Sequence, residues 1–251
     1  MIQSLRRGLE VLEFMAGRGG AATVSEAARF LDVDRSTSSR LLATLEGRGF
    51  VARASETQAY RLGSKLLVLS KVLLDSLSVA SASHDDIQAL ADRTGETAHV
   101  AILVGQEAVF VNHVDGREAL TISTSVGDRD PLYCTAIGRA LLLGMPDAGV
   151  RALLRGVKLI PYTRKTTTTI VGVLERLRAF RAQGYAFDDE ERHAGVQCLA
   201  APVRDHHGDV VGAIGISAPT LRVVKAGENV FAEAVLEAAR SLSARLGFAA
   251  E

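Results

Sequence analysis

The spacing of apolar residues at the start of the chain predicts a small helical domain. Residues 5–16 carry four apolar side chains at helical spacing, with charged residues between them: Leu5, Leu9, Leu12 and Met15. The sequence Thr23-Val24-Ser25-Glu26 fits a capping box, which predicts a second helix running to about residue 31. After a short turn over 32–34, Asp34 can cap a third helix over 35–46. The order is therefore helix, helix, turn, helix.

After the third helix the pattern changes. Phe50–Arg53 and Ala59–Leu62 flank a polar turn and predict a hairpin, as in the wing of a winged helix-turn-helix. Leucines then recur at spacings of three and four over 62–77, which predicts an apolar helix that needs a partner surface. That surface can belong to the helix's own domains or to a second copy. We favour a two-fold dimer contact around Leu66, Leu69 and Leu73.

From residue 84 onward, helical and strand patterns alternate. An amphipathic helix to about Arg93 precedes strand-like segments at 98–104, 108–114 and 120–123, joined by turns at 105–107 and 115–117. A helix capped near Thr135, a long helix over 170–183, strands at 196–203 and 210–217, and a last helix ending near Leu246 follow. Adjacent strands with helices between them predict an α+β domain with an antiparallel sheet. We expect a DNA-binding winged domain over 1–63, a linker helix with the dimer contact over 64–83, and a second domain over 84–251.

Charge refines this picture of the first domain. The chain has 251 residues with 29 basic and 29 acidic side chains, so its formal net charge is zero, which argues against a uniformly basic nucleic-acid-binding protein. The charge is uneven, however, because five arginines within 35–61 are accompanied by only two glutamates: Arg35, Arg40, Arg48, Arg53 and Arg61. By itself such a basic region fits a solvated surface or a nucleic-acid contact.

The third helix favours the nucleic-acid interpretation. Its polar face carries short hydroxyl side chains flanked by arginine, where a surface helix usually has long glutamate and lysine pairs. Short side chains let the helix backbone approach a flat polar surface, and they donate to phosphates or base edges. The predicted DNA contacts lie on this helix and on the wing: Arg35, Ser36, Thr37, Ser39, Arg40, Thr44, Arg53 and Arg61. A helical cap with a solvated serine-rich face, or a helix-turn-helix that contacts protein, are the alternatives.

Several function classes find no support in the sequence. Cys134 and Cys198 are too few for a disulfide framework or a four-cysteine zinc site, and a reduced cytoplasmic location is expected. No uncharged apolar run is long enough to cross a bilayer. The histidines are scattered and no glycine-rich phosphate loop precedes a helix, so we expect neither a metal nor a cofactor. Cys198 with His193 and Asp188 could form a cysteine-dependent hydrolase, but a cysteine in an apolar strand usually acts as a small hydrophobe, and no enzyme is predicted.

Three stretches carry a family resemblance. They are Asp34-Arg35-Ser36-Thr37 at the start of the third helix, Gly127 and Arg129 followed by Pro131–Leu142, and Gly195–Val203 with Gly208 and Val210–Gly212. Over nearly its whole length the chain resembles the IclR family of bacterial transcription regulators. The resemblance implies a GAF-like effector-binding domain, a homodimer or homotetramer, and a double-stranded DNA operator. A ligand-responsive repressor of a nearby catabolic operon is the function expected from it.

The resemblance also implies an effector pocket. Its residues would be Ile122, Ala136, Ile137, Asp188, Val196, Cys198, Gly215 and Ser217. Ala136 and Ile137 would offer backbone amides at a helix start, where an anion is favoured. Two positions depart from the family pattern: Tyr133 stands where the family often has histidine, and Gly215 where sensors of small acids carry a second serine. Because a polar anchor is lost and room is gained, we expect an aromatic or other bulky organic acid, or a derivative of one.

Overall fold

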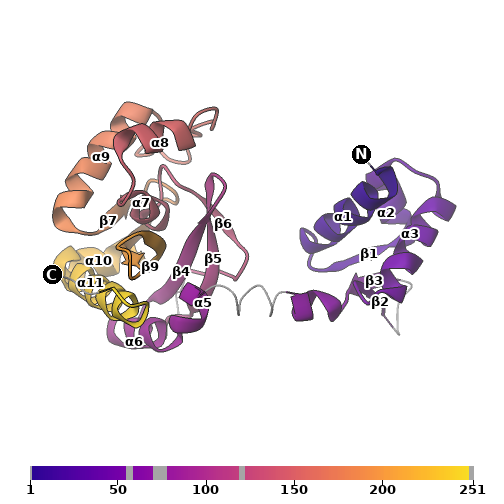
Figure 1. The fold of residues 1–251 in the computed structure, drawn as a ribbon, viewed down its shortest axis with the longest axis horizontal. Helices are drawn as coiled ribbons and strands as arrows, with labels where there is room; N and C mark the ends of the chain where they lie inside the picture. The colour runs from indigo at the N-terminus through magenta and orange to yellow at the C-terminus, as the bar shows by residue number, and fades with distance from the viewer. Residues whose placement is uncertain (1, 55–58, 70–77, 119–121, 249–251) are drawn as a thin grey trace. The chain divides into compact units, whose positions relative to one another are not determined.

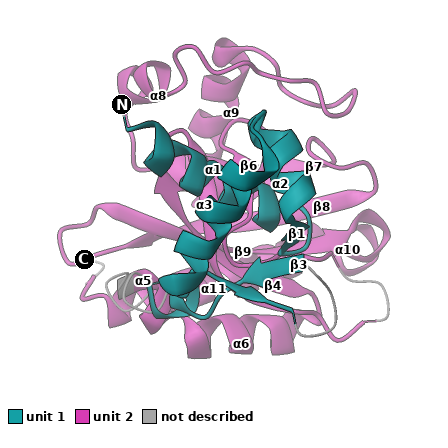
Figure 2. Cartoon of the chain, turned by 90° about the vertical axis from the view of Figure 1, so that its right-hand side faces the viewer, with its two compact units in different colours: residues 1–76 teal, residues 77–251 magenta. Residues whose placement is uncertain are grey.

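The computed structural model describes residues 2–54, 59–69, 78–118 and 122–248 and divides into two compact units, 1–76 and 77–251 (Figure 2). This division differs from the expected linker over 64–83. Residues 78–82 form helix α5 (Ser78–Ala82), and Val79 is buried in the apolar core of the second unit. The end of the expected linker is therefore part of the second unit.

The first unit contains three helices and a small sheet. Helices α1 (Gln3–Ala16), α2 (Val24–Leu31) and α3 (Arg35–Gly47) are joined by strand β1 (Ala21–Thr23), which the sequence analysis missed, and by a tight turn. Strands β2 (Val51–Arg53) and β3 (Ala59–Leu62) form the predicted hairpin arms, and β3 lies between β1 and β2 in an antiparallel sheet. The turn at 55–58 lies outside the described residues. These elements have the order and pairing of a winged helix-turn-helix.

The predicted caps set the helix starts. The Thr23 hydroxyl accepts from the backbone N–H of Glu26 at 3.2 Å, and the Glu26 carboxylate accepts from the Thr23 N–H at 2.8 Å. The Asp34 carboxylate accepts from the Thr37 N–H at 2.8 Å. Each interaction joins residues three apart, so local sequence is sufficient to specify it.

The buried face of α1 agrees only in part with the expected row, whose members Met15 and Leu12 do contact the core. Leu5 and Leu9 are 60% and 52% exposed, whereas Gly8, Val11 and Met15 are buried. A Cβ atom at Gly8 would lie 3.5 Å from the Leu41 side chain, so this face of α1 contacts α3. Helical spacing alone could not distinguish the two apolar rows, since both recur every three or four residues.

The expected linker helix is only partly within the described chain. Leu62 belongs to β3, and residues 65–69 are helical, so the helix begins after Gly63 rather than at residue 62. Within it Leu67, Val68 and Leu69 are 73%, 55% and 47% exposed. The predicted contact residue Leu73 lies among the residues 70–77 that are not described.

The second unit is built on a six-stranded antiparallel sheet in the order β6-β5-β4-β9-β8-β7. The strands are β4 (Thr97–Val104), β5 (Glu107–Val114), β6 (Arg129–Pro131), β7 (Ala186–Asp189), β8 (Val196–Arg204) and β9 (Val210–Pro219). The helices are α6 (His84–Thr94), α7 (Ala136–Leu142), α8 (Asp147–Leu153), α9 (Ile170–Gln183), α10 (Thr220–Ala226) and α11 (Glu228–Arg245). The analysis of sequence patterns missed α8 and α10. The predicted α+β class is confirmed.

Helices cover both faces of this sheet (Figure 1). One apolar core joins the sheet to α6 and α11, with Ile87, Ile214 and Val235 fully buried. The other joins the opposite face to α7, α8 and α9, with Leu142 and Leu177 fully buried. The start of α7 is thereby fixed against the sheet, and this packing positions the cavity described below.

One predicted strand is wrong. Ile122 and Ser123 are not in a strand, and residues 120–121 lie outside the described residues. The edge partner of β5 is β6, with Glu107 opposite Pro131 and Val109 opposite Arg129. A proline is tolerated there because β6 is an edge strand, where one face of the backbone needs no ladder partner.

Candidate functional site

The polar face of α3 is open to solvent. Arg35, Ser36, Arg40 and Thr44 are exposed, and Thr37 and Ser39 are partly so. On the opposite side of the helix Leu42 and Ser38 are fully buried, and the Ser38 hydroxyl donates to the Val24 carbonyl at 3.0 Å. Helix α3 is thus held by one face, while its predicted contact residues remain available to a partner.

Some of the predicted contacts already have partners within the chain. The hydroxyls of Ser36 and Thr37 donate to the Asp34 carboxylate at 2.5 and 2.7 Å, and these bonds hold the pKa of Asp34 far below its ordinary value. Thr44 donates to the Arg40 carbonyl at 2.8 Å. Arg40 itself makes no hydrogen bond or ion pair through its side chain within the described residues, so its guanidinium is free to bind an external group.

The two wing arginines differ. The Arg53 guanidinium donates through Nε and Nη2 to the Tyr60 hydroxyl at 3.1 and 2.9 Å and lies over the Tyr60 ring. Arg61, which follows Tyr60 in β3, is exposed. The structure therefore gives Arg53 a second role, packing within the sheet, that its position in the sequence did not indicate.

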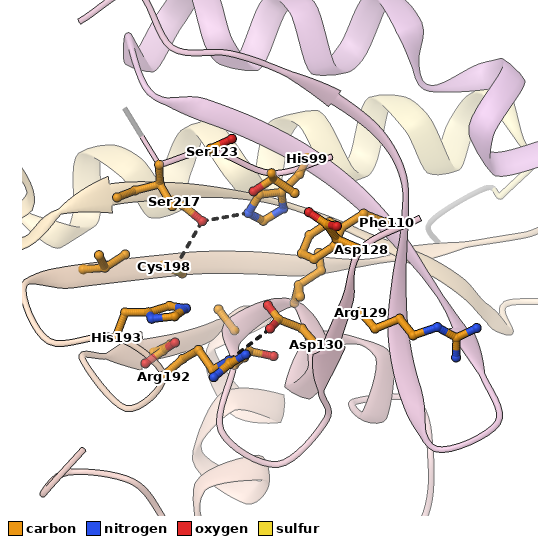
Figure 3. A pocket seen from close by; sticks show the side chains of 17 residues that line it. His99, Phe110, Ser123, Asp128, Arg129, Asp130, Arg192, His193, Cys198 and Ser217 are labelled. Atoms are coloured by element: carbon orange, nitrogen blue, oxygen red, sulfur yellow. Dashed lines mark hydrogen bonds and ion pairs between the residues drawn. The ribbon is translucent and has the colours of Figure 1, made fainter. Parts of the chain in front are cut away.

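A cavity of about 290 Å³ lies in the second unit beside the start of α7 (Figure 3). Its walls come from β4, β5, β6, α7, the β7–β8 segment, β9 and the stretch after residue 121. Seven of the eight residues expected at the pocket line it: Ile122, Ala136, Ile137, Asp188, Val196, Cys198 and Ser217. The expected residues, separated by up to 95 positions in the chain, are therefore brought together by the fold.

Gly215 is the exception, and this corrects the argument about ligand size. It does not line the cavity; a Cβ atom there would lie 2.4 Å from the Leu199 carbonyl oxygen and 2.7 Å from the Ala200 Cβ. The space that a side chain would take at residue 215 is already filled by β8. Tyr133 also lies outside the lining, because its buried hydroxyl bridges the backbone N–H and carbonyl of Ile160 at 2.7 and 2.8 Å. Neither departure from the family pattern enlarges the cavity.

One group of polar side chains in the cavity centres on Ser217. Its hydroxyl lies 3.0 Å from Nε2 of His99 and 3.3 Å from Sγ of Cys198 (Figure 3). Burial lowers the pKa of His99 to about 4 and raises the pKa of Cys198 well above its usual value. At neutral pH this group is therefore an uncharged imidazole, a hydroxyl and a thiol.

A second group surrounds Asp188. Its carboxylate accepts from the Glu191 N–H at 2.7 Å, and burial raises the pKa of Asp188 to about 7. Glu191 in turn forms a fully buried bidentate ion pair with Arg139 of α7, at 2.6 and 2.7 Å. Burial by itself would raise the pKa of Glu191, but the bonds and charge of Arg139 outweigh it and the pKa lies below its ordinary value. This pair ties the segment after β7 to the helix whose start lines the cavity.

Several lining residues were not in the expected set, among them His99, Asp130, Arg192 and His193. The Arg192 Nε donates to the Asp130 carboxylate at 3.1 Å. Arg192 and His193 directly follow the acidic residues 188–191. His193 was considered only as a member of a cysteine triad, and nothing in the sequence pattern marked Arg192. His99 lies in an apolar strand, and nothing in the sequence indicated that it would line the cavity, because only the pairing of β4 with β9 brings it near Ser217.

The arrangement does not form the imagined cysteine triad. A cysteine nucleophile reacts as the thiolate, whereas burial keeps the Cys198 thiol protonated. In the described part of the chain Sγ of Cys198 contacts Ser217, and no histidine hydrogen-bonds to it.

Over the same residues no cluster of three metal-ligating side chains is present. Across residues 2–54, 59–69, 78–118 and 122–248, no helix is long and apolar enough to span a membrane.

Comparisons with known proteins agree with this geometry. Residues 4–55 match the model of the IclR helix-turn-helix domain, and residues 71–244 match that of the bacterial transcriptional regulator IclR C-terminal domain. The HTH-type transcriptional regulator XynR of Escherichia coli strain K12 is 32% identical over 250 residues, covering 100% of this chain and 99% of that protein. The transcriptional repressor IclR of the same strain is 31% identical over 248 residues, covering 98% of this chain and 90% of that protein.

A solved structure gives the same result. The transcriptional regulator RHA06195 from Rhodococcus sp. RHA1 is 31% identical, with a TM-score of 0.87 and 98% of each chain covered. Both units, the order of their elements and the family models thus agree. The chain belongs to the IclR family of bacterial transcriptional regulators, with a helix-turn-helix DNA-binding domain and an effector-binding domain.

Proposed function

We propose that this regulator is a repressor whose affinity for an operator is controlled by a small organic acid bound in the cavity of the second unit. The observation that carries the proposal is the cavity itself, which gathers seven of the eight expected effector residues around buried polar groups. A repressing role is supported by the relative named transcriptional repressor IclR. Because its target is an operator in the bacterial chromosome, we place the protein in the cytoplasm.

The cavity limits the effector to a small molecule. Its volume of about 290 Å³ is at the lower end of the range of roughly 300–1,000 Å³ typical of ligand pockets. Phe110, Ile122 and Val196 provide apolar contacts, and Ser217 and Asp188 provide polar ones. These features fit an organic acid with at most one ring. The departure at Gly215 no longer supports a bulkier ligand.

DNA contacts are assigned to α3 and the wing. Arg35, Arg40 and Ser39 have no side-chain partner within the described residues and would contact bases or phosphates directly. Ser36 and Thr37, which bond to Asp34, would approach the DNA at the helix start, with Thr44, Arg53 and Arg61 around them. In a dimer, two such helices would enter successive major grooves about 34 Å apart.

Dimerisation is proposed through the helix after β3. Its described residues Leu67, Val68 and Leu69 expose apolar surface that a second copy would cover. Association into a dimer, or of two dimers into a tetramer, is measured by analytical ultracentrifugation. A Leu69→Lys variant should shift the protein toward monomer and lower operator affinity together, and a variant that remains dimeric would contradict this contact.

Two experiments test the function. In the first, the melting temperature of the full chain is measured with benzoate, pyruvate and glyoxylate to identify the class of acid that binds. In the second, the same acids are added to a gel shift of the protein with the DNA upstream of neighbouring genes. We expect at least one acid to raise the melting temperature and release the DNA. Binding of DNA that does not weaken with added salt would instead indicate a helix-turn-helix that contacts protein, since DNA affinity falls steeply with salt.

A cysteine-dependent hydrolase remains the alternative function, and we propose that the cavity binds its ligand without turnover. The raised pKa of Cys198 removes the thiolate that such chemistry needs. A Cys198→Ser variant should keep ligand-dependent release of DNA. Loss of a measurable hydrolysis reaction in that variant would favour the enzyme.

A further inference from the structure

Arg192 is held in an unusual way at the edge of the cavity. Its guanidinium carbon lies 4.0 Å from the centre of the Tyr162 ring, and its Nε donates to Asp130 at 3.1 Å. The Tyr162 ring is itself stacked with that of Tyr133, with 6.5 Å between centres. Two neighbours therefore fix both the plane and the direction of this guanidinium.

The other edge of the same guanidinium has no hydrogen-bond partner among the described residues. In the part of the chain that the structure describes, only Nε of the Arg192 side chain makes a hydrogen bond, which leaves the two terminal Nη nitrogens unpaired. The side chain is 24% exposed and lines the cavity. A guanidinium has five N–H donors in a planar fork, and two of them in parallel match a carboxylate.

The remaining candidates for binding an anion are weaker. Arg129 also lines the cavity, but its Nη1 donates to Glu107 at 2.7 Å, and the side chain points away from the other labelled residues (Figure 3). The group formed by His99, Ser217 and Cys198 is uncharged at neutral pH. Asp130, the present partner of Arg192, is not such a candidate, because it is itself a carboxylate. Its burial raises its pKa, so its charged form is poorly solvated.

We propose that Arg192 binds the acidic group of the effector, with its free Nη edge holding a carboxylate or another planar oxyanion in a bidentate pair. Tyr162 keeps the guanidinium plane in place for that pair. This proposal rests on the proposed function, because it assumes that the effector occupies this cavity. It gives the effector two features: an anionic group at Arg192 and a neutral hydrogen-bonding or apolar part toward Ser217.

The experiment compares an acid with its amide on the full-length protein. Benzoate and benzamide share one ring and differ in charge. Each is titrated into the protein while the Arg192 Nε–H signal is followed by ¹H–¹⁵N NMR. That signal is assigned by its absence from the spectrum of Arg192→Lys. Acetate, pyruvate and glyoxylate are titrated in the same way. We expect benzoate or one of these smaller acids to shift the Arg192 signal saturably together with the amides of Ala136 and Ile137. Benzamide should leave the Arg192 signal in place.

Variants separate position from charge. Arg192→Lys keeps the charge but loses the fork, so affinity for the bound acid should fall roughly tenfold to a hundredfold by calorimetry. Arg151→Gln removes a charge from an exposed position on α8 outside the cavity lining and is the matched control, with affinity expected within about twofold of the wild type. Tyr162→Phe should retain binding and Tyr162→Leu should weaken it, because only the aromatic ring stacks on the guanidinium.

The outcomes distinguish this proposal from the proposed function. An acid that shifts the Ala136 and Ile137 amides but not Arg192, or that binds Arg192→Lys as tightly as the wild type, overturns the role of Arg192 and leaves the cavity as the effector site. An equal loss in Arg151→Gln also overturns it, since the effect would then be one of general charge. If none of the four acids moves any signal of a cavity residue, the organic-acid effector fails and the role of Arg192 fails with it.

Discussion

Helix α3 holds its polar side chains in water, whereas the cavity of the second unit buries them. Arg35 and Arg40 are exposed and make no side-chain bond within the described chain. Asp188 and His99, in contrast, are each 2% exposed, and both have strongly shifted pKa values. The surface of α3 can bind a large charged partner at no cost to folding, because water solvates it until the partner arrives. The cavity is preorganised for a small ligand, and its buried polar groups cost free energy that packing and pairing must offset.

This difference predicts how variants will behave. A change on α3 should alter DNA binding and leave the folded state intact. A change in the cavity should alter stability as well as ligand binding. The expected effects decrease from the buried ion pair through Asp188 and Arg40 to the cap of α2.

The largest effect is expected at the buried ion pair. Arg139→Met removes the bidentate partner of the buried Glu191 and, among the described residues, leaves its carboxylate only the Thr167 N–H at 2.9 Å and the Arg176 Nε at 3.6 Å. The free energy of unfolding should therefore fall by about 3–5 kcal/mol. This loss is measured by urea unfolding of the full chain, with a signal that reports on the second unit. The double variant Arg139→Met/Glu191→Leu should recover part of the loss. A loss below about 1 kcal/mol would show that the pair is solvated in solution, and the contrast with α3 would weaken.

A smaller effect is expected at Asp188 and depends on pH. Its pKa of about 7 in the folded protein lies above the ordinary value of 3.8, so the stability gained from its protonation is complete below about pH 3.8 and disappears as the pH rises through about 7. Asp188→Asn should therefore be stabilised relative to the wild type by about 3 kcal/mol more at about pH 8 than at about pH 5.

Asp189 provides the matched control. It is the next residue in the chain, and although burial acts to raise its pKa, bonds to Gln197 and Lys165 hold the pKa below its ordinary value. Asp189→Asn should therefore show a small pH dependence of the opposite sign. Equal pH profiles for the two variants, from melting temperatures across the range, would contradict the burial of charge at Asp188.

On α3 the effect should fall on DNA binding alone. Arg40→Ala removes one contact with a base or phosphate in each protomer, which costs about 1–3 kcal/mol per contact. The gel-shift complex should be lost, with the melting temperature and acid binding unchanged. A lower melting temperature would show that Arg40 supports the fold, and undiminished DNA binding would remove it from the contact surface.

The smallest effect is expected at a helix cap. Thr23→Ala removes the hydroxyl that accepts from the Glu26 N–H and should destabilise α2 by about 1 kcal/mol, whereas Thr23→Ser should retain most of the stability. Hydrogen exchange of the α2 amides in the full chain measures this locally. Similar exchange in the alanine variant and the wild type would show that tertiary contacts, rather than the cap, hold this helix.

Much of the fold could be predicted from short-range signals. The caps at Thr23 and Asp34, the hairpin arms β2 and β3 and the β4–β5 pair were all expected and are present. The apolar row expected on α1 was right in part: Met15 is buried and Leu12 packs against the core, whereas Leu5 and Leu9 are exposed. The strand expected at 120–123 is not found at its described residues Ile122 and Ser123, because alternation of residues does not tell which segment reaches an open sheet edge.

The site was predictable in part. Seven pocket residues followed from the family resemblance, and they line the cavity. His99 and Arg192 did not follow, since neither residue type nor spacing marks them, and Gly215 was misinterpreted as free space. These outcomes depend on tertiary neighbours: β9 brings Ser217 to His99, β8 fills the position beside Gly215, and Asp130 and Tyr162 hold Arg192.

The sequence by itself determined the order of helices α1 to α3 and of the hairpin arms, the caps that start α2 and α3, and the polar face of α3. These depend on hydrogen bonds and spacings between residues that lie only a few positions apart in the chain. Only the tertiary structure decided which polar groups are buried, which pKa values shift and which edge of Arg192 stays unpaired. Burial and pairing join residues as distant as 99 and 217, and desolvation depends on everything packed around a group rather than on its neighbours in the chain.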